Sequence, residues 1–308
     1  MKILITGGSG SVGSYTVPRL IEKGYEIKVL DKRIDIFKGM EGKGLELKEG
    51  GIEERDKVNE AVKDTEVVVH LAWSFSEDPF ETFEVDMRGL LNLLDASVKN
   101  NLKQFIFVSS AVVYGSPKYA PIDEKHSCDV EDARKPLYAL AKYTGEKLCL
   151  VYQKESNLPI TNIRFWWGFG EEIGGKHLRN MIQKALDGEA IQVPKGAGGS
   201  FLHFDDFILG LEKVLLNEKA MGETFNLSSF YITWEEVAKM IVDIAGSGSV
   251  ETVSQSDWKG SSFIADEWDL TYKKLGDRLG FSPVYPDDEA KKLLKEAIKD
   301  CKKNMLKR

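Results

Sequence analysis

The sequence is poor in the residues that build disulfide and metal frameworks. Its 308 residues include three cysteines, Cys128, Cys149 and Cys301. They are odd in number and widely separated, so we expect a reducing compartment and no disulfide framework. The histidines number four, His70, His126, His177 and His203. Their spacing matches no metal-ligand motif, and we predict no metal site.

Long apolar runs and an excess of positive charge are also missing. No run is long enough to span a bilayer, and the first residues lack the basic and apolar blocks of a signal peptide. We therefore expect a cytoplasmic protein without membrane contact. The net charge of -7 argues against nucleic acid as a partner. What is present is an ordinary globular composition, 42% hydrophobic and 30% charged, which allows a sizeable core.

The first residues of the chain predict a strand, a glycine-rich turn and a helix. An apolar run at 3–5 fits a buried strand, and helical spacing of apolar residues follows at 12–24. Between them lie Gly7, Gly10 and Gly13, one residue away from the GxGxxG spacing. Such a turn directs backbone N–H groups and the positive end of a helix at one point, which suits a pyrophosphate. A glycine turn without a ligand is the alternative.

An acidic residue follows the second predicted strand, at 26–30. Asp31 lies about 20 residues after the glycines, where a carboxylate can bond both ribose hydroxyls of an adenosine. A carboxylate there repels a 2′-phosphate, which favours NAD over NADP. Lys32 and Arg33 weaken that preference, because a basic side chain could accept the phosphate. The alternative is an aspartate that only begins a turn.

Strands and helices alternate over the first half of the chain. Further strands are expected at 45–47, 66–71 and 104–109, with helices at 55–62 and 79–100, which together indicate a doubly wound parallel sheet. We expect a Rossmann domain at 1–166 and a smaller mixed substrate lobe at 167–308. Helices are expected in this lobe at 174–186, 207–216, 234–244 and 287–306, while the strand at 224–227 returns to the main sheet. His70 lies inside an apolar strand and is expected to be a packed core residue.

Candidate catalytic residues follow the fifth strand. Ser110 lies at its carboxyl end, where ligands bind in parallel sheets. Tyr138 and Lys142 are four residues apart and share one helix face. A free phenol has a pKa of about 10, and a nearby ammonium is expected to lower it, giving a proton relay beside a nicotinamide. A surface tyrosine and a solvated lysine are the alternative for this motif alone.

Taken together, these motifs resemble the extended short-chain dehydrogenase/reductases, in particular the NAD-dependent epimerase/dehydratase family. The resemblance runs from Met1 to about Leu279. The further motifs that match this family are His70-Leu-Ala72, Ser110 to Tyr114-Gly115, Arg164, Phe201-Leu-His-Phe-Asp-Asp206 and Gly222-Glu-Thr-Phe-Asn-Leu227.

The resemblance implies a role for each matching residue. Tyr138 would be the acid/base, Lys142 its electrostatic partner and a ligand of the nicotinamide ribose, and Ser110 the hydroxyl that polarises the substrate. The residues implied to hold NAD are Gly7, Gly10, Ser11, Val12, Gly13, Asp31, Ile52, Leu71, Ala72, Tyr138 and Lys142. The family also implies a homodimer, in which long helices of two subunits pair.

The chain departs from the family's pattern at four places. Ala111 and Val112 replace an Asp-Glu pair, which argues against a dehydratase. Trp167 replaces an asparagine, and the stretch 196–200 lacks an arginine that pairs with a nucleotide diphosphate. Asp86 replaces a common asparagine and is expected only to weaken a contact near the site.

The second and third departures argue against a UDP- or dTDP-sugar. They favour a smaller or more apolar substrate bounded by Trp73, Trp166 and Trp167. Alternatively, these tryptophans are packing residues, and another cation serves the phosphate. The candidates for that cation are Lys176, Arg179 and Lys195.

The favoured function is an NAD-dependent oxidoreductase of a secondary alcohol or ketone on a sugar-like substrate. A nucleotide-sugar 4-epimerase is the nearest alternative, because it uses the same residues but retains its cofactor through both half-reactions. A non-catalytic NAD(P)-sensing regulator is the alternative from another class. It is disfavoured because a sensor needs no proton relay.

Overall fold

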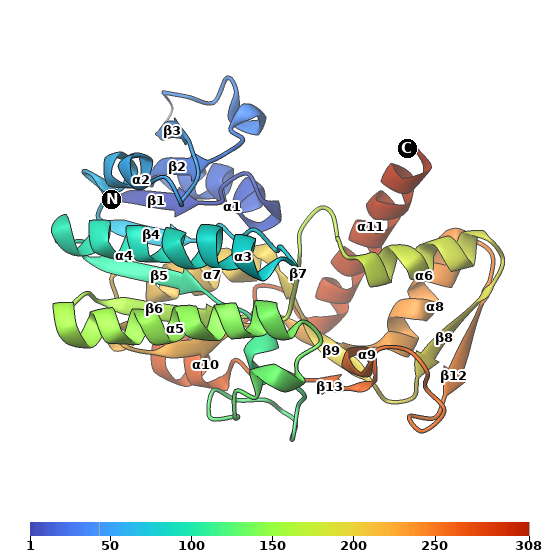
Figure 1. Ribbon diagram of the computed structural model, residues 1–308. Coiled ribbons are helices and arrows are strands. Elements are labelled where there is room, and N and C mark those ends of the chain that lie inside the picture. Colours follow the sequence, from blue (N-terminus) through green and yellow to red (C-terminus); the bar gives the residue numbers. More distant parts are fainter. Residues whose placement is uncertain (43, 308) are drawn as a thin grey trace.

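The computed structural model describes residues 1–42 and 44–307. One part is a seven-stranded sheet, and a smaller lobe lies beyond its carboxyl edge (Figure 1). All neighbours in the sheet are parallel, in the order β10-β6-β5-β4-β1-β2-β3. The strands are β1 (Lys2–Thr6), β2 (Glu26–Asp31), β3 (Leu45–Glu49), β4 (Val67–His70), β5 (Gln104–Val108), β6 (Ile160–Arg164) and β10 (Thr224–Asn226). The predicted Rossmann-like doubly wound sheet is confirmed.

The sheet reverses its strand order between β1 and β4. In such sheets the ligand crevice lies outside the carboxyl ends of the strands at this reversal. Both strands are buried on both faces, as their apolar sequences predict. The chain leaves β1 at Thr6 and β4 at His70, so the glycine turn and the segment after His70 meet at that edge.

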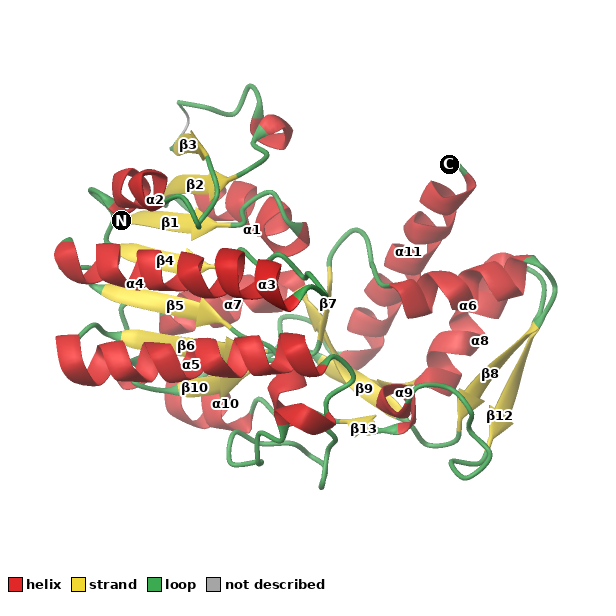
Figure 2. Cartoon of the chain, viewed as in Figure 1, coloured by secondary structure: helices red, strands yellow, loops and turns green. Residues whose placement is uncertain are grey.

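Helices cover both faces of the sheet (Figure 2). One face carries α2 (Arg55–Val62), α4 (Arg88–Lys99) and α5 (Pro136–Ser156). The other face carries α1 (Ser11–Glu22), α7 (Phe204–Val214) and α10 (Lys273–Leu279).

The helix expected at 79–100 is present as one continuous helical stretch, but it is not a regular α-helix throughout. A short α3 (Pro79–Glu81) is followed by a π-helical segment, Thr82–Met87, and then by α4. The π-helical segment contains no glycine or proline. Asp86, inside the segment, is fully buried and accepts hydrogen bonds from the Ser74 N–H and hydroxyl, both at 2.8 Å. The hydrogen bonds between Ser74 and Asp86 produce no periodic pattern in the sequence, so the π-helical segment could not be predicted from periodicity.

The smaller lobe is built on two short sheets. The first holds β7 (Trp167–Phe169), β9 (Gly198–His203), β11 (Phe230–Thr233) and β13 (Glu267–Trp268), and the second pairs β8 (Ala190–Pro194) with β12 (Ser249–Val253). Its helices are α6 (Lys176–Leu186), α8 (Trp234–Ala245), the short α9 (Ser262–Ala265) and α11 (Asp287–Leu306).

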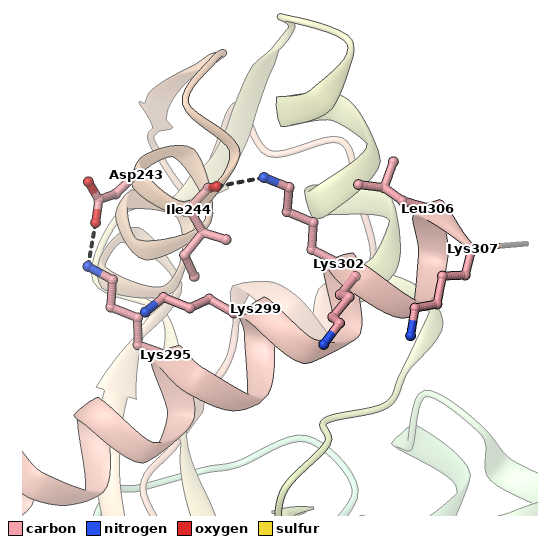
Figure 3. Close-up of a pocket in the computed structure, with 8 residues that line it drawn as sticks. Asp243, Ile244, Lys295, Lys299, Lys302, Leu306 and Lys307 are labelled. Atoms are coloured by element: carbon pink, nitrogen blue, oxygen red, sulfur yellow. Dashed lines mark hydrogen bonds and ion pairs between the residues drawn. The ribbon is translucent and has the colours of Figure 1, made fainter.

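The last helix, α11, carries its lysines on an exposed face (Figure 3). Lys295 pairs with Asp243, and Lys302 Nζ donates to the Ile244 carbonyl at 2.8 Å, which joins α11 to α8. The groove between them is lined mainly by lysines and lies in the smaller lobe, away from the glycine turn.

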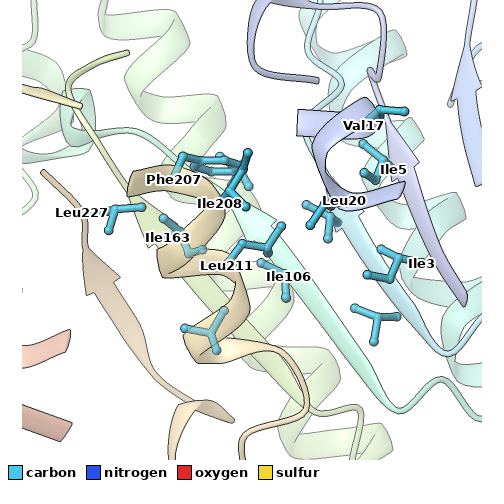
Figure 4. Close-up of a cluster of buried hydrophobic side chains, with 14 of the residues drawn as sticks. Ile3, Ile5, Val17, Leu20, Ile106, Ile163, Phe207, Ile208, Leu211 and Leu227 are labelled. Carbon is cyan, nitrogen blue, oxygen red and sulfur yellow. The ribbon is translucent and has the colours of Figure 1, made fainter. Parts of the chain in front are cut away.

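The core on the α1 and α7 side of the sheet fixes the position of the glycine turn. Val17 and Leu20 of α1 and Phe207 and Leu211 of α7 are fully buried against the sheet (Figure 4). Each such side chain contributes about 1.5–3 kcal/mol when it is removed from water. The start of α1 is therefore held rigidly at the end of β1.

On the opposite face, α5 approaches β5 closely at Gly145. A Cβ atom there would lie 2.7 Å from the Phe107 Cζ and 3.2 Å from the Leu90 Cδ2. This approach brings Lys142, about one turn earlier, against the end of β5, where its Nζ reaches the Val108 carbonyl.

We expect Gly145→Val to lower the free energy of unfolding by about 1–3 kcal/mol, because the added side chain overpacks the α5–β5 contact. Denaturant unfolding followed by circular dichroism measures it. Gly174→Val is the control, since nothing lies within 4 Å of a Cβ at Gly174. Equal stability of the Gly145 variant and the wild type would contradict the close approach.

Candidate active site

The glycine turn brings the end of β1 against the end of β4. Gly7 has φ +71°, and a Cβ there would lie 2.5 Å from the Ala72 backbone nitrogen. A Cβ at Gly13 would lie 2.5 Å from the Gly8 Cα, so α1 packs directly on the turn. Gly10 is the N-cap of α1 and makes no side-chain cap, which leaves the N–H groups of the first turn available to an anion.

A cavity of about 340 Å³ lies beside this turn, and we name it the glycine-turn cavity. The predicted cofactor residues that line it are Gly7, Gly10, Asp31, Ile52, Leu71 and Ala72. Ser11 instead faces a separate recess next to Tyr15 and Arg19, and Val12 packs on the core. The structure therefore brings most of the predicted cofactor residues to one cavity.

Asp31 is oriented by backbone donors at the rim of this cavity. Its carboxylate accepts the Ser9 N–H at 2.9 Å and the Arg33 N–H at 3.0 Å. Lys32 Nζ pairs with the Glu53 carboxylate at 2.6 Å, and Glu53 also lines the cavity. The charge of Lys32 is thus already matched by a carboxylate.

Tyr138 lines a second cavity of about 290 Å³, which we name the Tyr138 cavity. Phe75 lines both cavities, and its ring centroid lies 5.4 Å from that of Tyr138. The backbone of Phe75 has φ +54°, a strained conformation for a bulky residue and one that often marks functional sites. The two cavities therefore meet at Phe75.

Lys142 is buried and does not line either cavity. Its Nζ donates to the Val108 carbonyl at 2.8 Å and lies 3.7 Å from the Trp73 ring centroid. Phe107 adds a second aromatic face, 5.1 Å from the same nitrogen. Burial lowers the pKa of Lys142 to about 7, and the negative charges of Asp86 and Glu146 oppose that shift.

The expected lowering of the Tyr138 pKa by Lys142 is wrong. Burial raises the pKa of Tyr138 to about 12, the Ser110 hydroxyl acts in the lowering direction, and the charge of Asp86 raises it further. The physical reason is geometric, because the Lys142 ammonium is directed at a carbonyl and an indole face. Tyr138 is therefore a neutral phenol at neutral pH.

Two buried groups lie close to this pair. Burial raises the pKa of Asp86, although its two bonds to Ser74 hold the carboxylate in place. Asp86 also lines the glycine-turn cavity. His70 is a buried core residue, as predicted: Thr6 Oγ1 lies 2.8 Å from its Nδ1, and burial lowers its pKa to about 3.

The three tryptophans predicted to bound the substrate lie in two places. Trp73 lines the glycine-turn cavity and covers Lys142. Trp166 stacks with Phe263 and Trp268, and Trp167 lies flat on Phe201. Neither Trp166 nor Trp167 lines the glycine-turn cavity or the Tyr138 cavity.

Three residues of the site were missed at the sequence level. Ser74 and Phe75 were not assigned, although they directly follow the Ala72-Trp73 pair at the end of the fourth strand. Arg134 lines the Tyr138 cavity, and its signal was an Arg-Lys-Pro run immediately before the tyrosine–lysine helix. Over the described part of the chain, no cluster of side chains could hold a metal ion, and no helix combines the length and apolarity that crossing a bilayer requires.

Comparisons with known proteins match these features. The profile of the NAD dependent epimerase/dehydratase family matches residues 3–228. UDP-glucose 4-epimerase of Haemophilus influenzae is 32% identical over 190 residues, 57% of this chain and 55% of that protein. The chain thus spans little more than half the length of this epimerase.

Two longer matches cover nearly all of the chain. UDP-glucuronic acid decarboxylase 1 of Xenopus tropicalis is 25% identical over 307 residues, 94% of this chain and 70% of that protein. The structure of a short-chain dehydrogenase/reductase superfamily protein of Agrobacterium tumefaciens with bound NAD has a TM-score of 0.80 at 23% identity. This structural match covers 100% of this chain and 99% of the Agrobacterium protein, which shows that the two share a fold.

We expect the buried Lys142 to make stability depend on pH. Its folded pKa of about 7 lies below the unfolded value near 10.4, so the unfolded chain binds more protons between these values. The free energy of unfolding of the wild type should therefore rise relative to Lys142→Met by up to about 1.4 kcal/mol per pH unit from pH 7 to pH 10.

Denaturant titrations at several pH values measure this difference. Lys147→Met, at an exposed position of the same helix, is the matched control and should follow the wild type. Parallel profiles of the wild type and the Lys142 variant would show that the ammonium is not buried as described.

Proposed function

The chain belongs to the NAD-dependent epimerase/dehydratase family, and on this premise we propose that it is an NAD-dependent oxidoreductase of a secondary alcohol or ketone on a sugar-like substrate. The observation that supports this most is the placement of Tyr138. Its cavity meets the glycine-turn cavity at Phe75, and Lys142 lies one turn further along the same helix.

The glycine-turn cavity fits a dinucleotide. The uncapped start of α1 would hold the pyrophosphate, Asp31 the adenosine ribose, and Ile52 the adenine. When bound, NAD supplies an acceptor for a hydride. We propose NAD over NADP, since Asp31 would repel a 2′-phosphate and Lys32 is already paired with Glu53. Arg33 remains the residue that could accept that phosphate.

The side chains around Tyr138 would move the proton. In the oxidative direction the alcohol would give up a hydride and become a ketone, while its hydroxyl proton passes to the Tyr138 oxygen and the phenol's own proton leaves to solvent. In the reductive direction the neutral phenol would donate its proton to the developing alkoxide and be reprotonated from solvent. Ser110 would hold the substrate oxygen. Because burial raises the pKa of Tyr138 to about 12, the phenol carries its proton at neutral pH.

A nucleotide-sugar 4-epimerase is the second candidate, and the names of the relatives favour it. The same Tyr138 and Lys142 would serve both half-reactions. NAD that remains bound through purification would favour the epimerase, whereas free exchange with added NAD would favour the dehydrogenase. A non-catalytic NAD-sensing regulator has less support, because the chain contains Ser110, Tyr138 and Lys142, and a sensor needs no proton relay.

We also propose a cytoplasmic homodimer with a substrate lobe at 167–308. Exposed apolar side chains on the adjacent α4 and α5 support a second copy as the partner. They are Leu91, Leu140, Leu150 and Val151, each 38–45% exposed. The return of β10 to the main sheet shows that the lobe also contributes a strand to the first domain.

We expect Tyr138→Phe to reduce turnover about 10²- to 10⁴-fold, the usual contribution of a general acid/base, while the NAD affinity stays within a few-fold. NADH formation from a panel of polyols and calorimetric titration with NAD measure the two quantities. Tyr143→Phe on the same helix is the control. Full turnover by the Tyr138 variant would overturn the assignment.

We expect UDP-glucose not to bind at micromolar concentration. The stretch 196–200 has no cation for a diphosphate, and the Tyr138 cavity, at about 290 Å³, has the size of a single sugar rather than of a nucleotide sugar. Titration of the NAD-loaded protein with UDP-glucose, followed by cofactor fluorescence, checks this. A micromolar dissociation constant would contradict the small-substrate proposal and favour the epimerase.

A further inference from the structure

The Tyr138 cavity contains a cation without a carboxylate partner. Arg134 lines the cavity four residues before Tyr138. Among residues 1–42 and 44–307, no ion pair joins a carboxylate to Arg134, whereas the neighbouring Lys135 pairs with Glu77 at 2.9 Å. Glu77, the carboxylate among the described residues that line this cavity, is therefore already paired, and the solvent-exposed Arg134 guanidinium has no ion-pair partner there.

Arg134 is held between the two parts of the protein. Its guanidinium carbon lies 5.2 Å from the centroid of the Phe263 ring, which belongs to the smaller lobe. The positive charge of Arg134 also acts on His177 of α6. Burial is the larger cause that lowers the pKa of His177 to about 4, and the Arg134 charge is the next one. His177 is thus neutral at physiological pH and adds no competing charge.

The two cavities divide the site between cofactor and substrate. On the proposed function, the dinucleotide enters from the glycine turn and Asp31, on one side of Phe75. The Tyr138 cavity lies on the other side and is left for the substrate. Its volume of about 290 Å³ is at the lower end of the roughly 300–1,000 Å³ range of small-molecule sites. A single sugar-sized molecule is the matching size.

Resting on the proposed function, we propose that the substrate is an anionic polyol, whose carboxylate or phosphate group binds Arg134 while its reacting carbinol faces Tyr138. The planar guanidinium presents paired N–H donors that match two oxygens of such a group. A neutral polyol would leave this cation without a partner. The cavity thus selects for an acid group on the substrate, at a position away from the reacting carbon.

The test compares anionic and neutral sugars as ligands. D-glucuronate and D-glucose 6-phosphate are titrated against D-glucose, by saturation-transfer NMR, into the NAD-loaded and the NAD-free protein. Charge-assisted hydrogen bonds predict about 10- to 100-fold tighter binding of at least one anionic sugar. The carboxylate and phosphate arms show which acid group the site prefers. Added salt should weaken the anionic ligand selectively.

Variants then assign the effect to Arg134. We expect Arg134→Gln to reduce the anionic sugar to the affinity of glucose, and Arg134→Lys to recover part of the difference. Arg55→Gln, an exposed arginine on α2 with the same loss of charge, is the control and should behave as the wild type.

Equal affinity for all three sugars, no binding of either anionic sugar, or an unchanged preference in Arg134→Gln would each overturn the proposal. The NAD titration of the same samples reports on the proposed function separately. Protein that binds NAD and oxidises neutral polyols without preference keeps the proposed function and loses this inference. Protein that fails to bind NAD would overturn the proposed function, while the titration of the NAD-free protein would still test the role of Arg134.

Discussion

The ammonium group of Lys142 is the buried charge on which the candidate site depends. An unpaired buried charge costs several kcal/mol, so the protein must supply compensating groups. Here these are the Val108 carbonyl and the faces of two aromatic rings, Trp73 and Phe107. The close approach of α5 to β5 brings the lysine to that carbonyl. The packing of this helix and the chemistry of the site are therefore set by the same contacts.

Trp73 contacts the Lys142 ammonium and also lines the glycine-turn cavity. An indole face contributes about 0.5–2 kcal/mol to a cation, less than a carboxylate or several hydroxyl acceptors can. A bound ribose that offers hydroxyls to Lys142 would therefore compete with Trp73 for it. The same segment continues through Ser74, which Asp86 holds, to the strained Phe75 at the junction of the two cavities. Residues 73–75 thus lie between the Lys142 ammonium and the junction of the two cavities.

Much of this arrangement could be predicted from local sequence, because it depends on local geometry. Gly7 needs a positive φ, Asp31 ends a buried strand, and Tyr138 and Lys142 share a helix face by their spacing. The doubly wound parallel sheet followed from alternating strands and helices.

The parts that could not be predicted depend on contacts between distant segments. The π-helical turn around Asp86 is fixed by Ser74, and the direction of Lys142 is set by a carbonyl of another strand. The tyrosine–lysine spacing predicted the shared face but not where the ammonium points, so the pKa shift of Tyr138 was predicted with the wrong sign. Spacing alone also could not show whether Trp167 packs or lines a cavity.

A crystal structure of the protein with bound NAD would test the central claim most directly. The account predicts that the Trp73 indole has left the Lys142 ammonium, that this nitrogen bonds the nicotinamide ribose, and that the Tyr138 hydroxyl faces the nicotinamide ring. A dinucleotide bound in the cleft while Trp73 still covers Lys142, or with the Tyr138 hydroxyl directed away from it, would contradict the account.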